Sequence, residues 1–201
     1  MTLEEYLAWE EQTPLRYEYV SGEVYAMTGS TVRHNLIVGN IVHALRPVAR
    51  RHGCRVLFEA VKLRAAVDRV YYPDVMVACG KAADVELIVK KPSLVVEVTS
   101  RSTRGTDRRE KLDAYQKIPS LRTYLIVAQR HRHVIAYTRN ASDAWLREEF
   151  HGDGDVPVPF LDFELSLEQI YEDVALPPLT VREDREWEYW EDKFEVEELP
   201  I

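Results

Sequence analysis

A glutamate lies inside SLVVEVTS, the stretch from Ser93 to Ser100. The leucine and three valines around Glu97 predict a strand that is buried on both faces. Lone carboxylates are rarely fully buried, because removing a charge from water costs several kcal/mol unless another group compensates it. The fold of this chain must therefore bring a compensating group to Glu97.

A second carboxylate interrupts the apolar region before this strand. The sequence YYPDVMVAC places Asp74 directly after Pro73 and before a run of apolar residues. Because proline has no amide donor, it belongs at the start, a bulge or the edge of a strand, so Asp74 is expected where a strand begins. If the loop 80–92 lets the two strands pair, Asp74 and Glu97 converge at one end of a sheet.

Two adjacent carboxylates repel each other, and a divalent cation turns that repulsion into attraction. Their hard oxygen atoms suit Mg²⁺, with Mn²⁺ as the expected substitute, and such sites combine one or two carboxylates with substrate phosphates. A metal held there polarises a phosphoryl oxygen and lowers the pKa of bound water. Asp74 and Glu97 therefore point to phosphodiester hydrolysis.

A cation near the reacting phosphate would stabilise the charge that develops there. The position two residues after Glu97, where a nuclease often carries lysine, is Thr99. The helix expected over 107–117 offers Lys111 as a substitute, with Tyr115 four residues later on the same face. If this helix crosses over the end of the strand, Lys111 reaches the carboxylates.

Each of these features also has an ordinary structural explanation. An acid within a strand can pair with arginine or lie at an edge, and a Pro-Asp dipeptide is common by chance. The ordered set is more specific. It consists of an apolar strand with Pro-Asp, a loop, an apolar strand with glutamate, a polar turn and a helix with lysine.

Helical and strand-like segments alternate along the chain. Helices are expected from a Thr2 cap to a point before Pro14, over 31–52 and over 107–117, with a short closing segment over 160–172. Strands are expected in a hairpin around Ser21-Gly22 and over 55–58, 61–65, 70–79, 94–98, 122–128, 133–139 and 145–150. This order predicts an α/β or α+β domain with a mixed central sheet.

The domain is expected to cover residues 1–178, followed by a separate tail over 179–201. This tail holds nine acidic and three basic residues, which accounts for most of the formal net charge of −8. Trp187 and Trp190 recur at helical spacing in it, and tryptophans are unusual in a purely solvating tail. We expect the tail to dock on the body or to contact a protein partner.

The net charge argues against nucleic acid, but local clusters of basic residues matter more than the net value. Such a cluster follows the Glu97 strand, at Arg101, Arg104, Arg108 and Arg109. A solvated surface explains any one cluster, whereas the sharper interpretation is that these arginines hold the phosphates of a DNA substrate.

The composition, 46% hydrophobic and 30% charged, is ordinary for a soluble globular protein. No apolar run approaches the roughly 18 residues of a membrane span, and the acidic N-terminus is unlike a signal peptide. Cys54 and Cys79 are isolated in apolar, strand-like contexts, which favours reduced core residues over a disulfide or a metal pair. We expect a cytoplasmic protein that does not engage a membrane.

Together these residues resemble the PD-(D/E)XK nuclease superfamily and, more narrowly, the Uma-two family of restriction-endonuclease-like proteins of bacteria. The resemblance spans residues 1–178 and rests on six segments: YEYVSGEVYAM (17–27), STVRHNLIVGNI (30–41), YPDVMV (72–77), LVVEVTSRSTRGTD (94–107), EKLDAY (110–115) and RTYLIV (122–127). It implies a restriction-endonuclease-like fold, with a mixed central sheet flanked by helices and an extra N-terminal helix and β-hairpin.

The resemblance also implies roles for the polar residues. Asp74 and Glu97 would be the metal ligands, joined by the backbone carbonyl of Val98. Lys111 would be the catalytic lysine, displaced from the position that Thr99 occupies here.

Other residues take roles at the margin of the implied site. Glu18 would be the upstream acid that orients a metal-bound water, with Glu23 as the weaker alternative because it fits ordinary hairpin surface. His34 would approach the substrate, although helix capping or solvent exposure explains it equally well. Asp107 fits an acid favoured at a helix N-terminus. Tyr115 would be a core residue with its hydroxyl at the rim of the site.

The first hypothesis for function is a Mg²⁺-dependent endonuclease acting on DNA, and a homodimer fits it because a duplex has two strands to cut. The alternative is a catalytically silent nuclease fold that binds nucleic acid or a protein partner. A glycoside hydrolase using Asp74 and Glu97 fits the lysine and arginines poorly. GxSxG and P-loop motifs are absent, and the HRH at 131–133 lacks partners for a metal cage.

Overall fold

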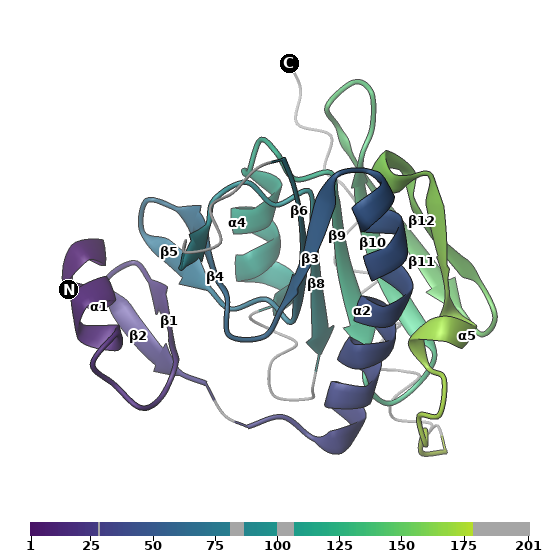
Figure 1. The fold of residues 1–201 in the computed structure, drawn as a ribbon, viewed down its shortest axis with the longest axis horizontal. Coiled ribbons are helices and arrows are strands. Elements are labelled where there is room, and N and C mark those ends of the chain that lie inside the picture. The colour runs from purple at the N-terminus through teal and green to yellow at the C-terminus, as the bar shows by residue number, and fades with distance from the viewer. Residues whose placement is uncertain (28, 81–86, 100–106, 179–201) are drawn as a thin grey trace.

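The computed structural model describes residues 1–27, 29–80, 87–99 and 107–178, with Asp107 and Arg108 described as backbone only. Figure 1 shows their arrangement. The acidic tail predicted over 179–201 lies outside these ranges, so its docking remains a prediction.

The described chain contains both helices and strands. The helical elements are α1 (Leu3–Glu10), α2 (Val32–Arg51), the π-helical turn η1 (Asp107–Lys111), α4 (Leu112–Gln116), the 3₁₀ turn η2 (Pro159–Leu161) and α5 (Leu167–Ile170). The strands are β1 (Tyr17–Val20), β2 (Glu23–Ala26), β3 (Cys54–Phe58), β4 (Lys62–Ala66), β5 (Arg69–Tyr71), β6 (Val75–Cys79), β7 (Ile88–Val89), β8 (Leu94–Thr99), β9 (Thr123–Ala128), β10 (His133–Arg139), β11 (Trp145–His151), β12 (Asp155–Val158) and β13 (Phe163–Ser166). Within these ranges, no helix is long and apolar enough to cross a membrane.

Local sequence signals start the first two helices and turn the N-terminal hairpin. The Thr2 side chain accepts the Glu5 amide and the Glu5 carboxylate accepts the Thr2 amide, which makes a capping box for α1. Thr31 caps α2. Ser21 and Gly22 have φ of 49° and 96°, the left-handed values that a two-residue hairpin turn requires. These observations confirm the predicted helices and hairpin.

A six-stranded sheet in the order β11-β10-β9-β8-β6-β3 forms the centre of the fold. Strands β8 and β9 are parallel, and the other pairs are antiparallel. The expectation of a mixed central sheet is confirmed. The pairing of β6 with β8 also joins the two strands whose carboxylates were expected to converge.

A second sheet, in the order β2-β1-β5-β4-β7, extends from the N-terminal hairpin. The strand predicted over 70–79 is divided between the two sheets as β5 and β6, because Pro73 cannot donate to a strand ladder. The loop predicted over 80–92 contains β7, which pairs with β4 over only two residues. A strand of two residues is too short to show the alternation of apolar and polar residues that predicts a strand, so it depends on pairing with its distant partner.

Different helices cover the two faces of the central sheet. Val96 and Val98 of β8 pack in a buried cluster with α2, whereas Val95 packs in another with Tyr115 of α4. Because strand side chains alternate between faces, Glu97 lies on the face of α4. Figure 1 shows α2 lying across the sheet and α1 with the β1–β2 hairpin at one end of the molecule.

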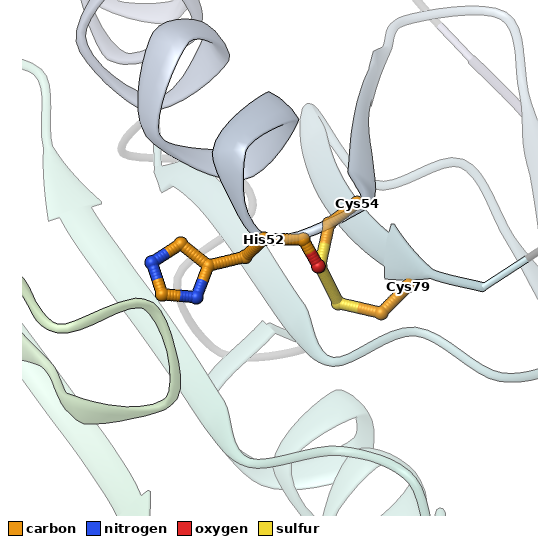
Figure 2. The surroundings of a disulfide bond; sticks show 3 residues. All are labelled: His52, Cys54 and Cys79. Atoms are coloured by element: carbon orange, nitrogen blue, oxygen red, sulfur yellow. A yellow bond between two sulfur atoms is a disulfide. The ribbon is translucent and has the colours of Figure 1, made fainter.

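The expectation that Cys54 and Cys79 are reduced core residues is wrong. They form a disulfide, shown in Figure 2, and Cys79 is exposed. The cause is the antiparallel pairing of β3 with β6, which places the two cysteines directly opposite each other. Nothing in the local sequence shows that these two strands are neighbours. The expected cytoplasmic location therefore loses the support that reduced cysteines would have given it.

Reducing this disulfide is expected to lower the free energy of unfolding. The two cysteines are 25 residues apart, and opening a loop of that length costs about 3 kcal/mol through the entropy of the unfolded chain. Guanidinium unfolding with and without a phosphine reductant measures the change. A Cys54→Ser/Cys79→Ser variant should have the unfolding midpoint of the reduced protein, and the reductant should not change it. Equal unfolding midpoints for oxidised and reduced wild type would contradict the expectation.

Candidate active site

Two polar groups compensate the buried carboxylate of Glu97. This residue is 4% exposed, and its Oε1 lies 3.1 Å from Lys111 Nζ. The Tyr115 hydroxyl donates to the same oxygen over 2.7 Å. Lys111 ends η1 and Tyr115 lies in α4, so their spacing of four residues directs both side chains to one point.

Lys111 also links Glu97 to the N-terminal hairpin. Its Nζ lies 3.0 Å from Glu18 Oε1, and only 6% of Lys111 is exposed. The same oxygen of Glu18 accepts the backbone amide of Tyr72 over 3.2 Å, which orients the carboxylate. One buried ammonium group therefore faces two carboxylates, and this excess of negative charge favours binding of a further cation.

Asp74 lies against the backbone of β8. Val75 of β6 pairs with Val96 of β8 in antiparallel register. Asp74, the residue before Val75, therefore lies beside Glu97, the residue after Val96. Its Oδ2 accepts the amide of Val98 over 2.6 Å. The structure therefore brings Asp74 to the end of β8 where Glu97 lies, as expected from the pairing of the two strands.

His34 approaches Asp74 from the first turn of α2. The Thr31 hydroxyl accepts the His34 amide over 3.2 Å, and His34 Nε2 lies 3.1 Å from Asp74 Oδ1. Burial lowers the pKa of His34, but the hydrogen bond and charge of Asp74, with the charge of Glu59, raise it overall. His34 is 9% exposed, so the alternative of a solvent-exposed histidine is wrong.

Tyr115 is fully buried, deeper than the expected rim position. Burial and then the charge of Glu97 raise the pKa of Tyr115 well above its ordinary value, so its hydroxyl remains a donor. We predict that Tyr115→Phe lowers the free energy of unfolding by about 1.5–3 kcal/mol, the range for a hydrogen bond to a charged group. Urea unfolding measures this loss. Tyr137→Phe, in the same buried cluster, is the control, and equal losses would contradict the prediction.

The remaining sequence-predicted residues divide into two groups. Glu23 is exposed and accepts the Tyr25 hydroxyl over 2.7 Å, so of the two upstream acids only Glu18 contacts Lys111. The other group lies outside the described structure, either wholly (Arg101 and Arg104) or by its side chains (Asp107 and Arg108).

The donor atoms at this place fit a hard divalent cation. Asp74 and Glu97 offer carboxylate oxygens at this end of β8. The backbone carbonyl of Val98 remains a predicted third ligand. Among the described residues, no compact cluster of three acidic or histidine side chains occurs here. Mg²⁺ commonly keeps several waters and uses one or two carboxylates together with substrate phosphates, so such a sparse donor set is suited to it.

Sequence reasoning missed a second group of polar residues. The interpretation that the HRH segment lacks partners is wrong, because Glu149 and His151 of β11 lie beside His133. A partial signal was present, since the strand predicted over 145–150 contains Glu149, and one further residue of strand would place His151 on the same face. The pairing of that strand with β10 was needed to recognise the group.

Comparisons with known proteins identify relatives of this chain. Residues 3–176 match the Uma2 family, which is described as "Putative restriction endonuclease". Two relatives from Synechocystis sp., both described as uncharacterized proteins, are 31% and 28% identical. The first alignment covers 76% of this chain and 89% of the relative, and the second covers 86% and 92%.

A solved structure shares the fold. It is described as "a putative nuclease belonging to DUF820" from Anabaena variabilis and has a TM-score of 0.71 at 19% identity. The match covers 87% of this chain and 99% of the other. The α+β architecture with its mixed central sheet is accordingly the restriction-endonuclease-like fold. Since the family match extends over most of the sequence, the chain belongs to the Uma2 family.

Proposed function

We propose that the protein is a Mg²⁺-dependent endonuclease that hydrolyses phosphodiester bonds of DNA. The observation that carries this proposal is that Glu18 and Glu97, from two separate strands, both contact the buried ammonium group of Lys111. Asp74 lies at the adjoining strand end. The description of the family as a restriction endonuclease supports DNA as the substrate.

Asp74, Glu97 and the carbonyl of Val98 would hold the metal ion. When bound, Mg²⁺ supplies Lewis-acid polarisation of a phosphoryl oxygen and a lower pKa for bound water. His34 orients Asp74 through Nε2, and the Val98 amide fixes the other carboxylate oxygen. Positioning of this kind keeps the ligand oxygens in place before the substrate arrives.

Lys111 and Glu18 act on the reacting groups. The ammonium group of Lys111 stabilises negative charge that develops on the phosphate, and Glu18 orients the attacking water. His34 Nδ1 is buried and makes no hydrogen bond to the described residues, so it offers a polar contact for a substrate oxygen. Arg101, Arg104 and Arg108 remain proposed phosphate contacts.

Cleavage of supercoiled plasmid DNA by the full chain tests this proposal. We expect nicked or linear product with Mg²⁺ or Mn²⁺, and no product with a chelator. Asp74→Ala should lower the rate at least about tenfold, because one metal ligand is lost. Asp68→Asn, in the turn between β4 and β5, is the control and should leave the rate unchanged. Cleavage that persists in Asp74→Ala at the wild-type rate would refute the proposal.

A second candidate function is a silent nuclease fold that binds nucleic acid or a protein partner without cutting. The ion pair between Glu97 and Lys111 favours it, because Lys111 already compensates the carboxylate without any metal. Salt-dependent DNA binding without metal-dependent cleavage would support this candidate. A homodimer remains a prediction of the nuclease proposal, and sedimentation with and without DNA would test it.

A further inference from the structure

Three potential metal ligands meet on one face of the β10–β11 pair. His133 and His151 are directly opposite in the strand register, and Glu149 precedes His151 by two residues. Residues two apart on a strand share a face, and diagonal neighbours across an antiparallel pair remain within reach of long side chains. The register therefore gathers two imidazoles and a carboxylate at one place.

The distances between these side chains suit a small ion. Glu149 Oε2 lies 2.9 Å from His133 Nε2 and 3.5 Å from His151 Nε2. One ligand atom from each residue lies within 4.8 Å of the others. Around a tetrahedral Zn²⁺ with bonds of about 2.1 Å, ligand atoms are roughly 3.4 Å apart, so the separations of these atoms are close to those of a metal site.

Neighbouring groups already hold two of the three ligands. His133 is 1% exposed, and its backbone amide and carbonyl both bond to the Tyr171 hydroxyl, over 3.3 Å and 3.0 Å. Arg147 donates to Glu149 Oε1, which leaves Oε2 directed to the histidines. The Arg147 contact orients the Glu149 carboxylate before a metal binds, whereas Tyr171 fixes the backbone from which the His133 ring extends.

His151 is the adjustable ligand. Its ring stacks on that of His133 with centroids 4.3 Å apart and an angle of 10° between the planes. The His151 side chain is 63% exposed, so it can tilt without disturbing the core. Because an imidazole nitrogen binds a metal in the plane of its ring, the His151 ring must rotate out of the stack to share an ion with His133 and Glu149.

We propose that His133, Glu149 and His151 form a site for a divalent transition metal of the Zn²⁺ class. Two imidazole nitrogens and one carboxylate oxygen match the ligands that Zn²⁺ prefers, whereas an all-oxygen donor set suits Mg²⁺. Three protein ligands leave a fourth position for water or another molecule. The ion would fasten β11, which forms one edge of the central sheet, to β10.

This site is separate from the carboxylates of the proposed nuclease centre. In the strand register, Glu97 pairs with Ile126, Ile126 with Ile135, and Ile135 with Glu149. Three inter-strand steps of about 4.8 Å place the two glutamates roughly 14 Å apart on the same face of the sheet. The two sites therefore share no ligand, and each can be removed without the other.

Isothermal titration of Zn²⁺ into the full chain, stripped of metal by a chelator, tests the proposal. We expect Zn²⁺ binding in the wild type that persists in Glu97→Gln, which removes a ligand of the nuclease centre. Adding His151→Ala to Glu97→Gln should weaken Zn²⁺ binding at least tenfold. Because His151 is exposed, its replacement leaves the fold intact, and circular dichroism verifies this.

His43→Ala is the matched control, since His43 is an exposed histidine of α2. His43→Ala should bind Zn²⁺ with the affinity of the wild type. Zn²⁺ should raise the thermal unfolding midpoint of the wild type and of His43→Ala, but not that of His151→Ala. Absence of Zn²⁺ binding to the wild type would overturn the proposal. So would Zn²⁺ affinity that is the same with and without His151.

Discussion

Replacing Lys111 with methionine is expected to cost the protein about 3–5 kcal/mol of unfolding free energy, the range for removing one partner of a buried ion pair. The reason is that Lys111 forms ion pairs with both Glu97 and Glu18, whose side chains are only 6% and 17% exposed. Methionine preserves much of the side-chain volume but leaves these carboxylates without that positive charge. Urea unfolding followed by circular dichroism measures the loss.

Lys117→Met provides the matched control for this prediction. Lys117 pairs with Asp113 over 2.7 Å, but both side chains are more than half exposed. Such a pair contributes about 0.3–0.5 kcal/mol, so the control should barely change stability. Adding Glu97→Gln to Lys111→Met should recover part of the loss, because one uncompensated charge is removed. A Lys111→Met variant as stable as Lys117→Met would contradict the buried ion-pair account.

The same lysine explains how far sequence reasoning could reach. The apolar run around Glu97 predicted a buried carboxylate that needs a partner, and the spacing of Lys111 and Tyr115 predicted which side chains could share a face. Both groups do contact Glu97. These features were readable because strand alternation and helix periodicity are local properties of a sequence.

Features that depend on which strands are neighbours could not be read in this way. The Cys54–Cys79 disulfide and the His133–Glu149–His151 group both require the register between two separate strands. The sequence ranks Glu18 above Glu23 because Glu23 fits ordinary hairpin surface, and the upstream acid itself is implied only by the family resemblance. The contact of Glu18 with Lys111 depends on the second sheet, which sets β1 beside β5.

The link between His34 and Asp74 is a further case. A histidine in the first turn of a helix gives no sign of what it faces, and the sequence left capping, exposure and substrate contact open. Its partner is settled by the packing of α2 across the central sheet, a tertiary contact. The local pattern thus located the two carboxylates, whereas the assembled fold determines which groups hold each of them.

Glu97→Gln is expected to lower DNA cleavage by about 1000-fold, which corresponds to roughly 4 kcal/mol of transition-state stabilisation at 1.36 kcal/mol per tenfold. The amide keeps the size of the side chain and can still accept the Tyr115 hydroxyl, but it is a poor ligand for a hard cation. Lys111 retains Glu18 as its partner, so stability should fall less than in Lys111→Met. Rates of plasmid nicking and titration with Mn²⁺ provide the two measurements.

Glu110→Gln separates loss of a ligand from loss of charge nearby. Glu110 precedes Lys111 in η1 and accepts the Tyr71 hydroxyl over 3.0 Å, so its charge is close to the site but is not assigned to the metal. Its replacement should leave Mn²⁺ affinity and cleavage near wild type. If Glu97→Gln binds Mn²⁺ and cuts DNA as well as Glu110→Gln does, Glu97 is no metal ligand. Its burial would then serve only the ion pair with Lys111.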